Sequence, residues 1–177
     1  MSRSRTFVGF LSFGLTIAAI IILLKLMNWL PMTVQKDTLR PYSSIEQVRS
    51  ALNIRDIYIP SYFPQNITWP PSKILAQGSP FSALVMEFKR AEKDEVILVL
   101  SQSRGGQLHA RNPLELTTVR ESVPLVIRGR DAVLAVGECG NGEQCSMISW
   151  SEGEYAITAH MRSAPFELSK IVATMHP

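Results

Sequence analysis

The sequence predicts an α+β protein, with an N-terminal single transmembrane helix followed by one antiparallel β-sheet domain that has a short N-terminal helix and a C-terminal helix. One observation is an uncharged apolar run at residues 7–24. Another is a series of short runs rich in Val, Ile and Thr, separated by turn residues. The last is helical spacing of apolar residues near both ends of the outer domain. The domain limits that follow are residues 1–5, a cytoplasmic tail; 6–31, the span; 32–42, a juxtamembrane linker; and 43–177, the extracytoplasmic domain.

Residues 6–31 are predicted to be an uncleaved signal anchor. At about 1.5 Å per residue the apolar run extends about 27 Å, close to the ~30 Å hydrocarbon core of a bilayer. A cleaved signal peptide would have a shorter apolar core, with a small-residue cleavage site after it. We expect Arg3 and Arg5 at one membrane interface and Lys25 and Trp29 at the other.

The orientation and the net charge restrict the partners. Basic residues flank both ends of the span, but a five-residue tail leaves little to place outside, so we expect the C-terminal domain to be extracytoplasmic in a cell membrane. Only three of the 18 Lys and Arg residues lie in residues 1–32, which leaves 15 to balance the 15 acidic residues. This balance argues against a nucleic-acid partner. The expected partners are the lipid bilayer and a membrane-protein complex.

The outer domain is predicted to begin with a short helix over residues 43–53. Ser44 with Gln47, or Ser43 with Glu46, forms a capping pattern before an apolar face. The next segment, residues 56–71, contains four prolines and cannot be helical. Its aromatic side chains either cover the sheet or form a partner-facing surface, and they are the candidate interface residues: Tyr58, Tyr62, Phe63 and Trp69.

The middle of the domain is predicted to be an antiparallel sheet built from hairpins. Strands are expected at residues 73–77, 82–90, 94–103, 117–129, 130–138, 145–151 and 155–161. Turns are expected at residues 91–94, at Gly129 with Arg130, and at residues 152–154.

A closing helix over residues 164–177 is predicted, with Ser163 as its N-cap and Pro165 in its first turn. Its apolar stripe would contain Phe166, Leu168, Ile171, Val172 and Met175.

The two cysteines, Cys139 and Cys145, flank the turn-forming residues 140–142. Their spacing matches neither a thioredoxin-type redox motif nor half of a zinc ribbon. In an oxidising compartment we expect a disulfide that closes this loop. Free thiols and a soft-ligand copper site remain the alternatives.

The copper alternative would combine Cys139, Cys145 and Met147 with His160 and Met161.

Several stretches of the chain resemble a family, namely "IYIPSYFPQNITW", "VMEFKR" with "VILVLSQS", "VPLVIRGRDAVLAV", "SMISWSEGEYAITAH" and "SAPFELSKIVATM". The resemblance is to an extracytoplasmic domain of unknown function in bacterial membrane-anchored and sporulation-associated proteins. It implies a half-barrel-like fold, similar to that of lipoprotein carriers and periplasmic sigma-factor regulators. The chain departs from the family in carrying "CGNGEQC".

The sequence contains no catalytic constellation. None of its three histidines lies in a metal-binding or catalytic spacing, and no G-x-S-x-G is present. We therefore expect no enzymatic activity and no cofactor. The leading hypothesis is an accessory subunit whose outer domain docks on a larger membrane or envelope complex. The alternatives are a half-barrel that binds lipid or another apolar ligand, and an envelope signal sensor.

Overall fold

A computed structural model describes residues 15–25, 39–106, 108 and 110–177, in two units divided between Thr38 and Leu39. In the first unit residues 15–25 are helical, and Lys25 at the end of this stretch is exposed. Within the described residues, no helix is both long and apolar enough to cross a membrane. Most of the predicted span, including Trp29, lies outside the described residues, as do Arg3 and Arg5 of the predicted cytoplasmic tail.

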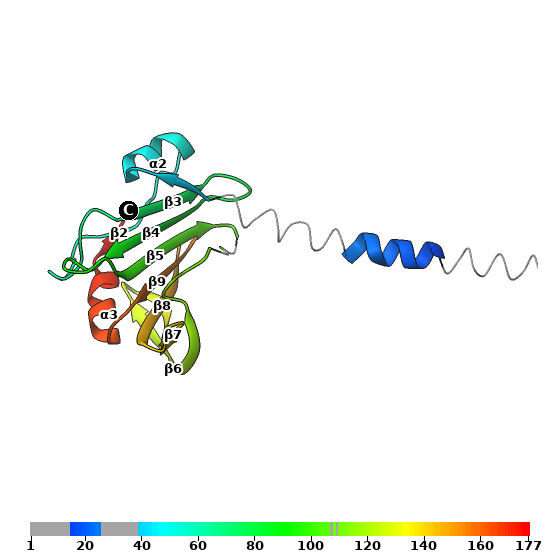
Figure 1. Ribbon diagram of the computed structural model, residues 1–177. Helices are drawn as coiled ribbons and strands as arrows, with labels where there is room; N and C mark the ends of the chain where they lie inside the picture. The colour runs from blue at the N-terminus through cyan, green and yellow to red at the C-terminus, as the bar shows by residue number, and fades with distance from the viewer. Residues whose placement is uncertain (1–14, 26–38, 107, 109) are drawn as a thin grey trace, which may run out of the picture. The chain divides into compact units, whose positions relative to one another are not determined.

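The second unit is α+β and contains one open antiparallel sheet of eight strands (Figure 1). In spatial order the strands are β1 (Arg40–Tyr42), β3 (Lys73–Gln77), β4 (Ala83–Lys89), β5 (Val96–Arg104), β9 (Tyr155–Met161), β8 (Gln144–Glu152), β7 (Arg130–Cys139) and β6 (Leu116–Ile127). The helices are α2 (Ile45–Leu52) and α3 (Pro165–Ala173), and a separate two-stranded sheet pairs β2 (Ile59–Pro60) with β10 (Met175–His176).

This architecture confirms the predicted α+β class and all seven predicted strands. The sequence did not predict the order of the strands in the sheet. In the structure β5 pairs with β9 and not with β6, the next strand in the chain. Strand β1 lies within the segment expected to be a linker, and it pairs with β3. The turn between β6 and β7 is one residue earlier than predicted. Arg128 and Gly129 occupy it, with φ of 51° and 76°, as two-residue hairpins require.

The predicted cap of α2 is confirmed. The Ser44 hydroxyl accepts a hydrogen bond from the Gln47 backbone N–H at 3.1 Å, and the Gln47 side chain accepts one from the Ser43 N–H at 2.9 Å. Two backbone donors at the helix start are thereby satisfied. Asn53, with φ of 52°, then ends the helix in the left-handed conformation.

The prediction for α3 was wrong in three details. Ala164 and not Ser163 occupies the N-cap, and it makes no side-chain hydrogen bond there. Phe166 is 67% exposed, so it is not part of the buried stripe. The helix ends at Ala173, and Met175 is buried as part of β10 because pairing with β2 continues the chain as a strand.

Both helices pack on the same face of the sheet and form the main core. Val48 of α2 and Leu168 of α3 are fully buried there, together with Leu84, Leu100 and Ile157 from the strands. The opposite face has a smaller core. It contains Val85, Val99, Leu114, Cys139 and Cys145.

A buried amide connects residues 56–71, here called the aromatic segment, to the centre of the sheet. The Gln102 side chain on β5 accepts a hydrogen bond from the Tyr58 N–H and donates one to the Asp56 carbonyl, both at 2.9 Å. Gln102 is nearly inaccessible, so these bonds satisfy polar atoms that burial would otherwise leave unpaired. The segment after Tyr58 therefore starts from a fixed position.

Candidate binding surfaces

The aromatic segment forms one side of a groove of about 380 Å³, here called the aromatic groove. Its lining residues are Arg49, Ile59, Pro60, Ser61, Phe63, Trp69, His176 and Pro177. They come from α2, from the aromatic segment and from the C-terminus, which the β2–β10 pairing holds beside that segment (Figure 1). Parts of the chain far apart in sequence therefore build this groove.

A stack of three rings fixes the exposed indole of the groove. The Phe63 ring centre lies 5.3 Å from that of Trp69 and 5.2 Å from that of Phe88, and the Trp69 ring also stacks on Phe88 at 6.1 Å. Phe88 is fully buried, whereas Trp69 is 51% exposed. One face of the indole is thus anchored to the core while much of its remaining surface is open to a partner.

The four predicted interface rings have different environments. Phe63 and Trp69 line the aromatic groove. Tyr62 is 40% exposed, and its backbone N–H donates to the Thr174 hydroxyl at 3.2 Å. Tyr58 points instead against Tyr155, with the ring centres 5.9 Å apart in an edge-on arrangement. Burial, and then the nearby carboxylates of Glu152 and Asp56, raises the pKa of Tyr58, which is typical of a packing residue.

Arg49 supplies an available positive charge at the aromatic groove. It is exposed on the last turn of α2, and it forms no ion pair with any residue in the described part of the chain. His176 also lines the groove, and its imidazole Nδ1 lies 3.3 Å from the Pro177 carbonyl oxygen. The groove therefore combines aromatic and aliphatic walls with one cation that can pair with a ligand.

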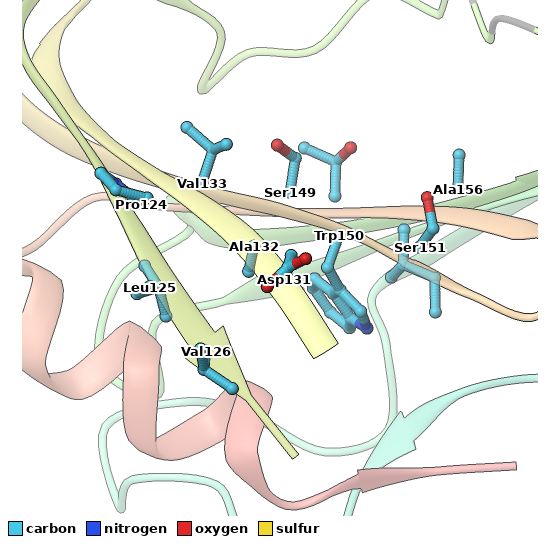
Figure 2. Close-up of a pocket in the computed structure, with 12 residues that line it drawn as sticks. Pro124, Leu125, Val126, Asp131, Ala132, Val133, Ser149, Trp150, Ser151 and Ala156 are labelled. Carbon is cyan, nitrogen blue, oxygen red and sulfur yellow. The ribbon is translucent and has the colours of Figure 1, made fainter. Parts of the chain in front are cut away.

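A second hollow, of about 560 Å³, lies over strands β6 to β9 (Figure 2). Figure 2 shows Val133, Ser149 and Ser151 on one side of the strands and Trp150 on the other. The strand register agrees, because Pro124, Val133, Ser149 and Thr158 are successive partners across the four strands. This hollow therefore lies chiefly on the sheet face opposite the helices.

A third hollow, of about 330 Å³, lies farther along the same face, and we call it the His160 hollow. Val85 and Val99 line it from the strands, and Leu108 and Leu116 line it from the β5–β6 connection and the start of β6. Thr158 lines both this hollow and the one in Figure 2. The face opposite the helices thus has two adjoining depressions with apolar and hydroxyl-bearing walls.

The predicted disulfide is confirmed. Cys139 and Cys145 are bonded, with their Cα atoms 5.7 Å apart, and both are buried. Gly142, with φ of 78°, turns the loop between them, and its N–H donates to the Cys139 carbonyl at 2.8 Å. Glu143 in the same loop pairs with Arg162, which also pairs with Glu95.

The arrangement does not support the copper alternative. Both sulfurs are engaged in the disulfide, and Met161 lies in the main core, whereas the neighbouring His160 faces the opposite side. Over the described residues, no group of three or more His, Cys, Asp or Glu side chains is arranged to hold a metal ion.

No family model, curated protein or solved structure matches this chain. The resemblance to extracytoplasmic half-barrel domains therefore remains an expectation, and functional inference rests on the three hollows. Sequence reasoning found two residues of the aromatic groove but neither depression on the sheet face. The only available signal was the alternation in residues 155–161, which places Thr158 and His160 on one side of a strand.

Proposed function

We propose that this protein is a non-enzymatic, single-pass membrane protein whose extracytoplasmic domain docks on a partner in the same membrane through the aromatic groove. The observation that carries this proposal is Trp69, an indole stacked on buried Phe88 yet half exposed beside a groove. Aromatic side chains that are already ordered lose little conformational entropy on binding, and they are enriched among interface hot spots.

The chemistry of the groove favours an extended partner segment that combines an apolar residue with an acidic one. Phe63, Trp69 and Pro60 offer an apolar wall, and Arg49 offers a charge that has no ion-pair partner within the described residues. A carboxylate on the partner would pair with the guanidinium, and this pairing would fix the register of the segment.

Two features support a membrane-tethered, extracytoplasmic placement, namely the apolar N-terminal segment and the disulfide. The sequence of residues 6–31 has the length and apolar character of a membrane anchor. A tether of this kind raises the effective concentration of partners in the same bilayer. The Cys139–Cys145 disulfide is typical of an oxidising compartment. We include in this proposal that the open sheet is half-barrel-like, since only one of its faces carries the helices.

Purification in mild detergent with Trp69→Ala tests the docking proposal. We expect the loss of a hot-spot ring to cost roughly 2 kcal/mol, about thirtyfold in affinity, so that a membrane partner recovered with the wild type is depleted. Phe166→Ala is the matched control, because Phe166 is a comparably exposed ring on α3 outside the groove lining. Circular dichroism establishes that each variant is folded.

Arg49→Glu provides a second variant, because an exposed side chain on α2 can be changed with little effect on folding. We expect this charge reversal to weaken recovery of the same partner. Folded Trp69→Ala and Arg49→Glu variants that recover the partner as the wild type does would refute docking through the aromatic groove.

A second function, binding of an apolar ligand, is favoured by the hollow in Figure 2. Val126 and Val133 are exposed there beside Pro124, and together they give the hollow an apolar wall. A soluble fatty-acid analogue that competes with a fluorescent apolar probe at this hollow would support it. Val133→Asp, which places a charge on the same wall, should then abolish binding of the probe.

A further inference from the structure

The His160 hollow contains a buried polar atom without a protein partner. His160 is 8% exposed and lies in register between Val99 on one neighbouring strand and Met147 on the other. Its Nδ1 atom is buried and accepts or donates no hydrogen bond within the described residues. Buried side-chain nitrogens are nearly always paired, so this one requires an explanation.

The protonation state of the ring defines what Nδ1 can do. Burial lowers the pKa of His160 to about 4, and a hydrogen bond with the Leu114 backbone opposes this shift. The imidazole is therefore neutral near pH 7 and carries one proton. Nδ1 is the ring nitrogen without a partner among the described residues, so the bond with the Leu114 backbone belongs to Nε2. A neutral imidazole bonded in this way presents a lone pair at Nδ1, which is then an acceptor.

The side chains that line the hollow around the His160 ring indicate the polarity and charge of a molecule that would fit there. Val85 and Val99 contribute aliphatic surface from the sheet, and Leu108 and Leu116 contribute it from the opposite side. Exposed Arg111 and Glu115, of opposite sign, also belong to the lining. An ion buried against the aliphatic walls would lose its hydration, and the flanking charges give no net preference for either sign, so these walls favour a neutral molecule.

We propose that the His160 hollow binds a small neutral molecule with an apolar body and one N–H or O–H group, which donates a hydrogen bond to Nδ1 of His160. A volume of about 330 Å³ is at the small end of the range for ligand pockets. The site is independent of the aromatic groove. It is also distinct from the hollow in Figure 2, although Thr158 lines both.

Indole and 1-methylindole form a matched pair of probes, because they share an apolar body and only indole has an N–H donor. Titration calorimetry of the full-length protein in mild detergent, with detergent alone as the reference, measures both. We expect indole to bind at least about tenfold more tightly, since the methylated probe leaves Nδ1 buried and unpaired. Equal affinity for the two probes, or no binding of either, would overturn the proposal. The latter result would leave ordered water as the partner of Nδ1.

His160→Phe and His160→Gln separate the acceptor from the shape of the site. Phe fills a similar volume without an acceptor, so the preference for indole over 1-methylindole should disappear. Gln retains a carbonyl acceptor and should restore part of that preference. If His160→Phe fails to fold, the ratio of the indole and 1-methylindole affinities in the wild type and in His160→Gln still tests whether Nδ1 accepts the hydrogen bond. Trp69→Ala should leave indole binding unchanged, so a failure of partner docking is distinguishable from a failure of this site.

Discussion

His160 is a polar residue that the fold keeps uncharged. Its strand alternates between two faces, and this position faces away from the helices, under the β5–β6 connection. Desolvation there disfavours the imidazolium and lowers its pKa to about 4 from an ordinary value of 6.5. The unfolded chain therefore binds a proton at a higher pH than the folded protein does.

The wild type should consequently lose stability as the pH falls from about 6.5 to about 4. Protonation in this window occurs in the unfolded state first, so it favours unfolding, and the full difference is about 3 kcal/mol at the acidic end. Urea denaturation at pH 7 and pH 4.5 measures this loss in the full-length protein. His160→Gln should show a smaller loss, by about 2 kcal/mol or more, because glutamine does not titrate. An identical pH dependence in the two proteins would contradict the assigned protonation state.

Trp69 illustrates how one residue combines stability with recognition. Its contact with Phe63 and Phe88 gives the ring a fixed orientation, and its half-exposed surface faces solvent. Trp69 therefore belongs both to the packed rings and to the exposed surface. Two measurements on Trp69→Ala separate these contributions. The loss of partner recovery reports recognition, and the loss in the free energy of unfolding reports stability.

The edge hairpin formed by β6 and β7 has two residues with specific backbone roles. A Cβ at Gly137 would overlap the Thr118 carbonyl oxygen, so only glycine allows the strands to approach this closely beside the irregular register. Pro124 lies within β6, the outer strand of the sheet. Proline lacks an N–H donor and is tolerated at a sheet edge, where it also reduces pairing with other chains.

The loop between β7 and β8 depends on the disulfide at its base. Closing a ring of about seven residues in the unfolded chain is expected to stabilise the fold by about 2 kcal/mol on the chain-entropy model. The double substitution C139A/C145A should therefore lower the free energy of unfolding by about that amount, as measured by urea denaturation of the full-length protein. Since both cysteines are buried, alanine avoids adding a polar group.

Reduction of the wild type is the control for C139A/C145A, since it breaks the bond without removing the sulfurs. Under a strong reductant the wild type should approach the stability of the double variant. Rapid alkylation of both thiols in the native protein without reductant would show that the bond is absent.

At the scale of the whole outer domain, the two faces of the sheet have different roles. One face is covered by α2 and α3 and contains most of the core. The other has a small core near the disulfide and two adjoining hollows. Covering a single face of an antiparallel sheet is common, but the uncovered face is then usually polar. The exposed Val126 and Val133 on this face are the surface on which the proposed binding of an apolar ligand depends.

The proposed topology makes a prediction for the full-length chain in its membrane. A reporter that is active only outside the cytoplasm, fused after Pro177, should be active, because the domain is expected to follow a signal anchor across the membrane. A reporter active only in the cytoplasm, fused at the same position, should be inactive. The opposite pair of results would overturn the extracytoplasmic placement and with it the expectation that Cys139 and Cys145 are oxidised in the cell.

Most of the local structure could be predicted from the sequence. The alternation of apolar residues identified the seven long strands, Ser44 with Gln47 identified the cap of α2, and the residues around Gly142 indicated a loop closed by a disulfide. Each of these signals lies within about ten residues of chain, and it depends on backbone preferences that operate before the domain is assembled.

The tertiary structure alone decided where the binding surfaces are. Pairing of β5 with β9, and of β2 with β10, joins segments separated by more than 40 residues, and no local pattern encodes such partners. That pairing brings His176 to the same groove as Phe63 and places His160 between Val99 and Met147. The sequence determined the seven strands β3 to β9 and the two helices of the outer domain. Long-range packing decided which side chains are buried, exposed or left without a partner, because burial depends on everything that covers a residue.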